Sequence, residues 1–557
     1  MAVFGVGGGT SSYREAEDAD LLVLWGSNAR EAHPIFFHHV LAGVRRGAKL
    51  YVVDPRRTGS AQWADTWLGI DVGSDIALAN AVGREIIHAG LHDESFIQRA
   101  TTGFQDYAAS VEPYTLERAE AITGVPAGAI RQLAHDYAKA ERAQLCWTLG
   151  ITEHHNATDN VLALINLALL TGHVGRYGSG LVPLRGQNNV QGGGDMGAIP
   201  NKLPGFHDIE TDPGARARFG QRWGTTIPAR RGQHLSEMFE SMEHGRLRAL
   251  YVIGENPARS EADQHKAERL LGGLDHLVVQ DIVLTRTAEL ADVVLPAAST
   301  LAEAEGTVTS SERRVQRVRR ALPPPGSARD DLDIISELAA RMGRGWGHPS
   351  AEAVWDELRS LSPAHAGMSY RHLEQAGGLQ WPCPSEDHPG TLFLHERLWA
   401  DPVEGPRAPF NAVDYAPPVD ELSDEFPVRL TTGRRLDSYN TGVQSAGLRT
   451  PLRRPETLDL SPEDMADYGL REGDVVQISS RRGSVQAPVR ADPTLRPGLA
   501  FMTLHFPEEV STNVLTIDAW DPKSGTSEFK ATAIRIEKLT ARTPAAEPAL
   551  PHTGAHS

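Results

Sequence analysis

The chain has 557 residues, 40% of them hydrophobic and 23% charged, and is long enough for several globular domains. Lysine and arginine number 55 against 72 aspartates and glutamates. This formal net charge of −17 disfavours a general nucleic-acid surface and the passive attraction of small anions. No apolar run reaches the roughly 18 residues that could span a bilayer, and the first residues lack the pattern of a secretion signal. We therefore expect a cytoplasmic protein without a nucleic-acid partner and without membrane insertion.

Cysteine and histidine usage gives no protein-ligated metal site. Cys146 and Cys383 lie far apart, and no Cys-x-x-Cys occurs, so the chain as given offers no ligands for an iron–sulfur cluster. Cys146 stands in an apolar stretch typical of a packed core thiol. The adjacent His154 and His155 lack the spacing of a helical zinc site. We predict no metal ligand among the residues of this chain.

A strand, a tight turn and a second strand are predicted near the start. Leu21–Trp25 is an apolar run that ends in Gly26-Ser27-Asn28, followed by a segment compatible with a helix. Lys49–Val53 is the next apolar run and ends at Asp54. An acidic residue at this point meets a ribose hydroxyl in dinucleotide folds, and a carboxylate can also accept the paired N–H donors of guanine.

The same layout returns in the second half. Ala249–Ile253 leads to Gly254-Glu255-Asn256, and His276–Gln280 ends at Asp281. Asp65 and Asp292 each lie 11 residues after the acidic residue (65 − 54 and 292 − 281). Thr58 and Thr285 each lie four residues after it. α/β proteins can repeat such units for folding reasons alone. The matching offsets favour two related lobes that bind two similar nucleotide ends.

A polar, glycine-rich stretch lies between the two units. It runs from Leu184 to Asp195 and follows the segment Gly150–His155 and a helix-like run, Asp159–Thr171. Glycines allow the backbone to approach a ligand, and Gln and Asn amides can both donate to and accept from a heterocycle. A flexible surface loop is the alternative, but the flanking apolar segments favour a buried functional loop.

The last part of the chain predicts a separate β-rich domain that begins near Phe426. The runs expected as strands are Val428–Leu430, Val475–Ile478, Ser484–Val489, Leu499–His505 and Lys530–Ile536. Arg481-Arg482-Gly483 is expected as a hairpin turn. Pro363–Pro418 is expected as connecting structure and Ala541–Ser557 as a solvated tail.

Taken together, these motifs resemble the large subunit of molybdenum formate dehydrogenases, which belong to the molybdopterin oxidoreductases. The motifs are Gly26-Ser27-Asn28, Glu31-Ala32-His33-Pro34, Val53-Asp54-Pro55-Arg56-Arg57-Thr58, Arg185-Gly186-Gln187-Asn188-Asn189-Val190-Gln191-Gly192, Gly254-Glu255-Asn256-Pro257, Ala291-Asp292-Val293-Val294-Leu295-Pro296, Glu305-Gly306-Thr307-Val308-Thr309, Glu312-Arg313-Arg314-Val315-Gln316, Leu430-Thr431-Thr432-Gly433-Arg434 and the region from Asn513 to Lys530. The resemblance implies molybdenum or tungsten held by two molybdopterin guanine dinucleotides.

The resemblance also implies a fold and its limits. The fold class is α/β, with two pseudo-symmetric nucleotide-binding α/β lobes and a C-terminal β-barrel domain. We expect the first lobe at residues 1–187, the second, incomplete lobe at 188–345 and a connecting segment at 346–425. The β-barrel that binds molybdopterin dinucleotide is expected at 426–540, and a disordered tail at 541–557.

Site residues follow from the same resemblance. The residues implied to bind the cofactor are Gly26, Asn28, Asp54, Arg56 and Thr58 at one nucleotide, Gly254, Asn256, Asp281 and Thr285 at the other, Gly150, Thr152, Gly186 and Gln187 near the pterins, and Thr431, Gly433, Arg434, Asn513 and Lys530 in the β-domain. Arg56 and Lys530 have an alternative as solvated or paired surface residues.

Arg185 is the expected catalytic residue. If formate is oxidised to carbon dioxide, a guanidinium fork can hold its carboxylate with two parallel hydrogen bonds and compensate the repulsive net charge. The alternative is a structural arginine that braces the glycine-rich loop. An iron–sulfur or NAD-reducing subunit that accepts electrons is a further partner that this reaction would use.

The sequence departs from the family pattern at several positions. Glu153 stands where relatives commonly have Gln, Ala157 where Gly is usual, Ser310 where Asn is usual and Ser438 where His is usual. A carboxylate at Glu153 near an anionic cofactor would cost free energy unless it is protonated or paired.

A larger departure lies near Phe4, where a glycine-rich stretch begins. In the family, a Cys or selenocysteine followed by His binds the metal shortly before such a stretch, and a 4Fe-4S domain precedes it. We therefore expect a truncated reading frame whose product lacks formate dehydrogenase activity and the cluster. Its second lobe should have an unpaired sheet edge and exposed apolar surface. Another molybdopterin oxidoreductase, such as a nitrate reductase, and a non-catalytic cofactor-binding fragment remain the alternatives.

Overall fold

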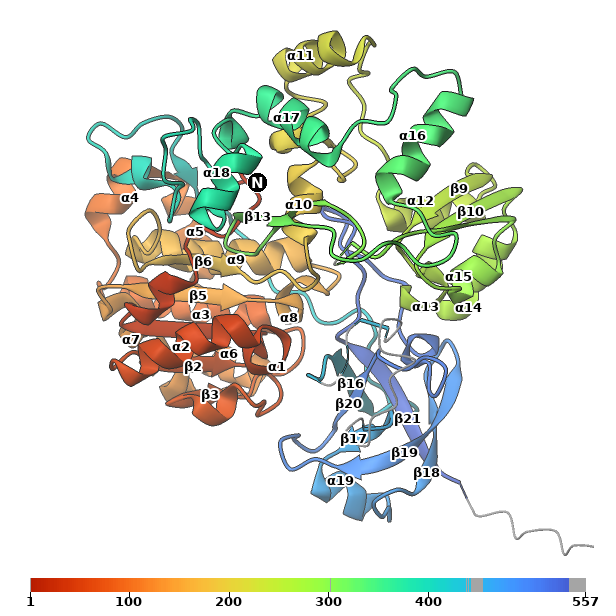
Figure 1. Ribbon diagram of the computed structural model, residues 1–557. Coiled ribbons are helices and arrows are strands. Elements are labelled where there is room, and N and C mark those ends of the chain that lie inside the picture. Colours follow the sequence, from red (N-terminus) through yellow and green to blue (C-terminus); the bar gives the residue numbers. More distant parts are fainter. Residues whose placement is uncertain (1, 301, 437, 439, 442–453, 540–557) are drawn as a thin grey trace, which may run out of the picture.

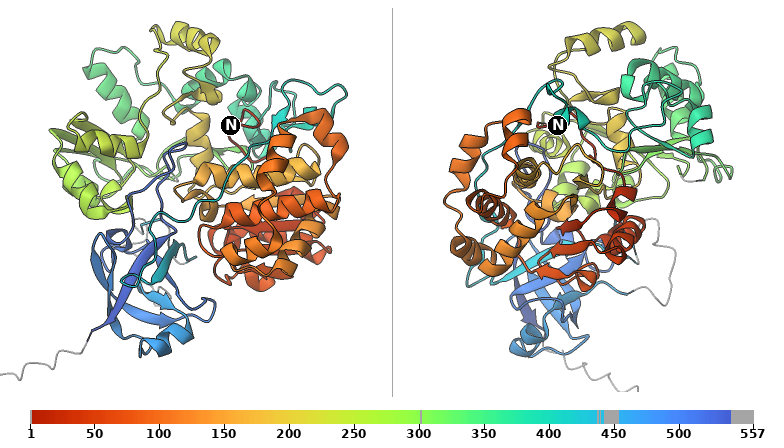
Figure 2. Two further views of the ribbon diagram at one scale, coloured as in Figure 1. Left: turned by 180° about the vertical axis from the view of Figure 1, so that it is seen from behind. Right: turned by 90° about the vertical axis from the view of Figure 1, so that its left-hand side faces the viewer.

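The computed structural model describes residues 2–300, 302–436, 438, 440–441 and 454–539, so the predicted tail at 541–557 lies outside the described residues. Figure 1 shows two α/β lobes, one red to orange and one lime green, and a blue β-barrel. The views in Figure 2 show the barrel below the second lobe and next to the lower part of the first. In the described part of the chain, no helix combines the length and apolar character that crossing a membrane requires.

The first lobe is built on a five-stranded sheet with the strand order β3-β2-β1-β5-β6. Every neighbouring pair in this sheet runs parallel. The strands are β1 (Leu21–Trp25), β2 (Lys49–Val53), β3 (Thr66–Leu68), β5 (Ala143–Trp147) and β6 (Gly180–Pro183). The two strands predicted from apolar runs, β1 and β2, have the predicted bounds.

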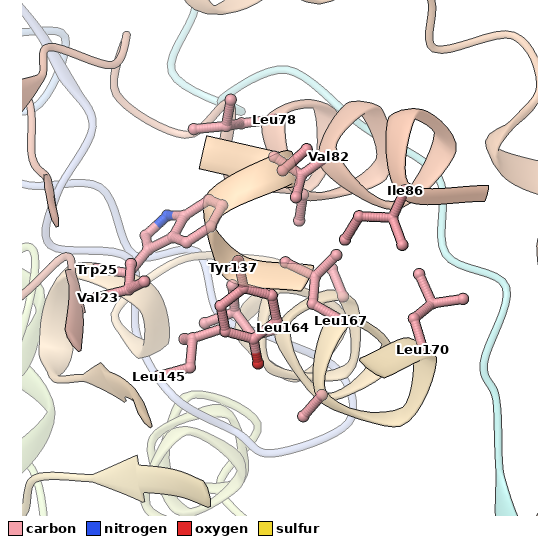
Figure 3. Packing of buried hydrophobic residues seen from close by; sticks show 14 of the residues in the cluster. Val23, Trp25, Leu78, Val82, Ile86, Tyr137, Leu145, Leu164, Leu167 and Leu170 are labelled. Carbon is pink, nitrogen blue, oxygen red and sulfur yellow. The ribbon is translucent and has the colours of Figure 1, made fainter. Parts of the chain in front are cut away.

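Helices cover both faces of this sheet, as is usual for parallel sheets. Val23 and Trp25 pack in one core with α3, α7 and α9, whereas Leu24 packs on the opposite face with α2. Figure 3 shows the first of these cores, with Leu164 among the side chains that α9 contributes. The helices of this lobe are α1 (Ala29–Ala32), α2 (Pro34–Arg45), α3 (Asp75–His88), α4 (Glu94–Ala100), α5 (Phe104–Val111), α6 (Leu116–Thr123), α7 (Ala127–Lys139), α8 (Leu149–Thr152) and α9 (Ala157–Thr171).

The second lobe repeats three strands of the first. Its parallel sheet has the order β11-β10-β9, in which β9 is equivalent to β1, β10 to β2 and β11 to β3. The strands are β9 (Ala249–Ile253), β10 (His276–Asp281) and β11 (Val293–Pro296). The helices are α12 (Leu235–Glu243), α13 (Pro257–Ser260), α14 (Gln264–Gly272) and α15 (Arg286–Glu289). The helix α11 (Pro213–Trp223) packs apart from this sheet, in a cluster with Leu203 and Leu361. Strand β10 includes Asp281, one residue more than predicted.

One edge and one face of the second sheet are open. Within the described ranges β9 pairs with β10 alone, whereas β1 has a neighbour on each side. Val252 and Val279 pack under the helices of the lobe. On the opposite face, Ile253 and Val293 are 41% and 40% exposed. Exposed apolar surface and an unpaired edge are the features expected for this lobe.

The glycine-rich stretch is partly helical, which differs from the predicted loop. Residues 184–189 are irregular, and α10 (Val190–Asp195) follows. Asn189 precedes this helix with φ 61°, and a Cβ on Gly192 would lie 1.9 Å from the Asn189 side chain. Because the glycine leaves room for that side chain, three successive glycines are compatible with a helix here.

A middle segment links the second lobe to the barrel. It forms the antiparallel sheet β12-β13-β14 and a core that includes Trp355 and Trp381. Its elements are β12 (Gly306–Thr309), β13 (Arg314–Val318), α16 (Asp331–Arg341), α17 (Ala351–Leu361), α18 (Tyr370–Ala376) and β14 (Leu379–Gln380). The buried Arg313 donates to the carbonyls of Gly9 (2.7 Å) and Leu392 (2.8 Å), which fixes the start of the chain against this segment.

The C-terminal domain is a closed barrel with the order β16-β20-β17-β19-β18-β21. Its strands are β16 (Val428–Gly433), β17 (Leu458–Leu460), β18 (Val475–Ser479), β19 (Ser484–Ala491), β20 (Leu499–Thr503) and β21 (Thr532–Lys538), with α19 (Pro462–Asp467). The predicted strands are present with ends shifted by one to three residues, and Lys530 lies before β21 instead of inside it. The short β17 was not predicted. Two α/β lobes with related sheets and a C-terminal barrel confirm the predicted fold class.

Short elements complete the described chain. They are the 3-10 helices η1 (Arg14–Glu17), η2 (Ala61–Trp63), η3 (Pro204–Phe206), η4 (Pro363–His365), η5 (Glu396–Trp399) and η6 (Thr512–Val514), and the strands β4 (Thr101–Thr102), β7 (Lys202–Leu203), β8 (His207–Asp208) and β15 (Ala408–Pro409).

Candidate functional site

A cavity of about 1630 Å³ lies where the two lobes, the middle segment and the barrel meet. All but two of the residues predicted to form the site line it. These are Gly26, Asn28, Asp54, Arg56, Gly150, Arg185, Gly186, Gln187, Gly254, Asn256, Asp281, Thr285, Thr431, Gly433, Arg434, Asn513 and Lys530. Thr58 and Thr152 do not line it.

The two turns that follow β1 and β9 have the same geometry. Gly26 has φ 57° and its N–H donates to Val53, at 2.8 Å. Gly254 has φ 64° and donates to Gln280 over the same distance. Positive φ favours glycine, so each glycine allows its turn to leave the strand without strain.

The two asparagines hold equivalent loops. The Oδ1 atom of Asn28 accepts from the hydroxyl of Ser60 (3.0 Å), and the Oδ1 atom of Asn256 accepts from the hydroxyl of Thr287 (2.8 Å). Ser60 lies six residues after Asp54 and Thr287 six residues after Asp281. The asparagines thus keep each acidic residue in place beside the cavity.

The threonines and the second pair of aspartates are equivalent as well. Thr285 caps α15 by accepting from Ala288 N at 3.1 Å, and Thr58 accepts from Ala61 N at 3.4 Å. The carboxylate of Asp65 accepts from Leu50 N at 2.8 Å, and that of Asp292 accepts from Leu277 N at 2.7 Å. Thr58, Asp65 and Asp292 do not line the cavity. Their hydrogen bonds hold the loops of each lobe instead.

Asp54 and Asp281 stand at the ends of equivalent strands and line one cavity. Oδ1 of Asp54 accepts from Arg56 N at 2.9 Å, and Oδ1 of Asp281 accepts from Ile282 N at 2.7 Å. Burial raises the pKa of Asp54 to about 6, an effect that Arg56 partly opposes, and burial raises the pKa of Asp281. A ligand that donates hydrogen bonds to these carboxylates would offset their desolvation.

Gly150 lies directly against the turn at Gly26. Its N–H donates to the Gly26 carbonyl at 3.2 Å, and the Thr148 hydroxyl donates to the same oxygen at 2.7 Å. A Cβ on Gly150 would lie 2.5 Å from that oxygen. Only glycine allows this close approach, which places the backbone of both turns at the cavity wall.

The departure at Glu153 is balanced by an ion pair. Its Oε2 atom lies 2.7 Å from Nζ of Lys530, which also donates to the Thr432 carbonyl at 3.1 Å. The sequence left open whether Glu153 is protonated or paired, and the structure shows that it is paired. The contact joins the first lobe to the barrel at the edge of the cavity.

The loop at 185–187 is bound from the barrel side. Arg434 donates to the Gly186 carbonyl at 3.0 Å, and Gln187 donates to Asn440 at 3.2 Å. The guanidinium of Arg56 lies 3.6 Å from the centre of the Phe501 ring, a cation–π contact that directs it along the same wall.

Comparisons with known proteins agree with this architecture. The family described as Molybdopterin oxidoreductase matches residues 7–341, and the Molydopterin dinucleotide binding domain matches residues 428–533. The chain belongs to the molybdopterin oxidoreductase family.

Relatives in this family extend over almost the whole chain. The F420-dependent formate dehydrogenase 2 subunit alpha of Methanococcus maripaludis is 39% identical over 96% of this chain and 79% of its own length. Formate dehydrogenase H of Escherichia coli is 36% identical over 96% and 75%. The acetylene hydratase of Pelobacter acetylenicus has the same fold, with a TM-score of 0.72 and 20% identity over 95% of this chain and 79% of that one. The protein is therefore an oxidoreductase with a molybdopterin cofactor.

Sequence reasoning missed a buried charged group on the cavity wall of this molybdopterin oxidoreductase. His154 is 2% exposed; its Nδ1 lies 3.2 Å from Oε2 of Glu528, and its Nε2 lies 3.2 Å from the Gly150 carbonyl. Both ring nitrogens face acceptors, which indicates the charged imidazolium. Burial lowers the pKa of His154, but the nearby Glu528 carboxylate has the larger opposite effect, so the net shift of the pKa is upward. Burial raises the pKa of Glu528, and the histidines reverse this to a net decrease.

No signal in the sequence could have found this pair, because Glu528 belongs to the barrel and His154 to the first lobe. Neither cysteine lines the cavity: Cys146 packs under the first sheet and Cys383 in the middle segment. Among the described residues, no three His, Cys, Asp or Glu side chains are grouped as metal ligands.

Proposed function

We propose that the cavity binds two molybdopterin guanine dinucleotides and that the protein is the catalytic large subunit of a molybdenum formate dehydrogenase. The observation that carries the cofactor proposal is the duplication of the half-site around Asp54 and Asp281. In this proposal each carboxylate accepts from the N–H groups of one guanine.

The residues of this chain fit such a cofactor. Asp54 is 8% exposed, and Arg56 N is the one hydrogen-bond donor that reaches its carboxylate from the described residues. Its other oxygen can accept from a ligand. The close contact of Gly26 and Gly150 leaves backbone at the wall, where a side chain would fill space.

Cationic groups near the cavity would then meet the anionic parts of the cofactor. We assign this task to Arg56, Arg434 and Lys530, which line the cavity from the first lobe and the barrel. These charges would offset the repulsion between an anionic cofactor and a chain of net charge −17. When bound, the group supplies a molybdenum or tungsten centre that accepts electrons from the substrate.

Arg185 is the residue that we assign to the substrate. Its guanidinium is partly buried at the cavity wall, where it can hold a carboxylate by two parallel hydrogen bonds and fix the direction of the C–H bond. Formate appears in the names of the relatives, and the words subunit alpha in those names support the presence of a partner subunit. We assign the acceptance of the electrons to that partner.

The experiment uses the isolated protein in its cofactor-loaded form with an artificial electron acceptor. Formate-dependent reduction of oxidised viologen supports the proposal. Reduced viologen consumed with nitrate, but no reaction with formate, would favour a nitrate reductase. Bound pterin and metal without either reaction would favour a non-catalytic cofactor-binding protein.

A further inference from the structure

One edge of the Arg185 guanidinium is bound to the protein. Its Nη2 donates to the Gly7 carbonyl at 2.8 Å, and its Nε donates to Oε1 of Gln191 at 3.2 Å. The backbone is fixed as well, since Arg185 N donates to the Ser311 hydroxyl at 2.8 Å. Among the described residues Nη1 meets no acceptor, so Nη1 and the second hydrogen of Nη2 form the edge that is left for a ligand.

The amide of Gln191 has one possible orientation in this arrangement. Its Nε2 donates both to the Gly7 carbonyl and to Oδ1 of Asp195, each at 3.1 Å. Because the nitrogen is used by two acceptors, Oε1 must face Arg185. Gln191 and Asp195 are four residues apart on α10, which places them on one side of the helix.

Asp195 fixes this amide from behind. It is 2% exposed, and its Oδ2 accepts from the indole N–H of Trp381 at 3.0 Å. The nearest basic side chain to Oδ2 is His365, whose Nε2 is 3.9 Å away. Burial lowers the pKa of Arg185, and the charge of Asp195 opposes this.

The position of Asp195 behind an amide is chemically significant. A carboxylate in direct contact with Arg185 would occupy its fork and compete with an anionic substrate. Here Gln191 stands between the two charges. The guanidinium keeps a compensating charge, and its outer edge stays available.

We propose that Asp195 and Gln191 are positioning residues that turn the outer edge of Arg185 toward the cavity and thereby set the affinity for a small carboxylate. This inference rests on the proposed function of Arg185 in binding formate. Neither residue touches the substrate in this account; both act through Arg185.

Asp195→Asn keeps the size of the side chain but sets an amide against an amide. Either the Gln191 nitrogen or the indole of Trp381 loses its acceptor, and Gln191 can turn its nitrogen toward Arg185. Hydrogen bonds to charged groups are stronger than those between neutral groups, so we expect KM for formate in a formate-oxidising form of the enzyme to rise at least about tenfold, with kcat changed much less.

Gln191→Leu tests the same link from the other side and covers the case in which Asp195→Asn fails to fold. The double variant should bind formate about as weakly as either single variant, because one chain of contacts is broken once. Asp464→Asn is the matched control: Asp464 is buried in the barrel, accepts from Gly498 N at 2.9 Å and does not line the cavity. Its formate affinity should equal that of the wild type.

The decisive measurement is the dissociation constant of formate, nitrate and acetate for the cofactor-loaded protein and these variants, with cofactor content measured alongside. Weaker formate binding with normal cofactor content and a non-additive double variant supports the proposal. Unchanged constants in Asp195→Asn and Gln191→Leu overturn it, as do additive effects. If the wild type binds nitrate instead of formate and the variants weaken nitrate, the proposed function fails and the positioning role stands. If the wild type binds none of these anions, both fail.

Discussion

Replacing Glu528 by glutamine removes the negative charge beside His154 and so perturbs the contact between the barrel and the first lobe. Oε2 of Glu528 accepts from His154 Nδ1 at 3.2 Å and from His155 N at 3.0 Å, while Oε1 accepts from Lys530 N at 3.0 Å. The amide can keep the donors on one side only. The His154 imidazolium is left buried beside a neutral group.

The magnitude follows from the burial of both partners, whose side chains are 3% and 0% exposed. Removing one partner of a buried ion pair costs about 3–5 kcal/mol. His154 can lose its proton in the variant, which limits the loss, so we expect about 3 kcal/mol. Glu537→Gln on the exposed end of β21 is the control and should cost less than about 0.5 kcal/mol.

The effect depends on pH in a defined direction. The pKa of His154 is raised in the folded state, so its contribution is fully present below the unfolded value of about 6.5 and is lost as pH rises through the folded value. The pKa of Glu528 is lowered, so its contribution is present above the unfolded value of about 4.3 and is lost as pH falls through the folded value. The difference between variant and wild type is therefore largest between about pH 4.3 and 6.5.

Amide hydrogen exchange is the suitable assay, because a chain of several domains has no single free energy of unfolding. Amides at the start of α9 and around residue 528 should exchange roughly 100-fold faster in Glu528→Gln at pH 6, the equivalent of about 3 kcal/mol. Equal exchange in variant and wild type, or a difference that grows above pH 8, would refute the assignment of a buried ion pair.

Three further predictions concern the cofactor and the substrate. Asp54→Asn or Asp281→Asn should each lower the bound guanine nucleotide toward half by nucleotide analysis, because an amide replaces one of the two acceptor oxygens by an NH₂ donor; unchanged content would exclude these carboxylates as guanine ligands. Gly150→Ala should lose the cofactor by forcing a Cβ to 2.5 Å from the Gly26 carbonyl, whereas Gly128→Ala, with no atom within 4 Å, should retain it, as absorbance of the purified proteins will show. In a formate-oxidising form of the enzyme, Arg185→Lys should lower kcat/KM for formate about 100-fold or more at normal cofactor content, since lysine cannot form the fork; equal kinetics would contradict the role.

The duplicated half-site was predictable because its signals are local. Strands and turns are recognised from neighbouring residues: a short apolar run indicates a strand, and a glycine indicates a turn. Here an acidic residue also follows the second strand of each unit. In the structure Asp54 and Asp281 lie at equivalent strand ends, as these signals predict. The sequence could not show that Asn28 accepts from Ser60, because offsets along the chain do not fix side-chain direction.

Contacts between domains were not predictable. Glu153 was suspected as a cost, and its partner Lys530 lies in another domain with no spacing signal between them. The same holds for His154 and Glu528. The helix α10 was missed because three glycines oppose helix propensity, and the hydrogen bonds of Asn189 with Thr309 N and of Gln191 with Arg185 depend on tertiary packing.

The number of guanine nucleotides bound per chain tests the central claim most directly. Mild acid hydrolysis of the purified, cofactor-loaded protein releases guanine nucleotide, which chromatography quantifies against polypeptide and against metal. Two lobes with equivalent acidic half-sites predict two guanine nucleotides per chain and one molybdenum or tungsten. One guanine nucleotide per chain, or a pterin without any nucleotide, would contradict the account.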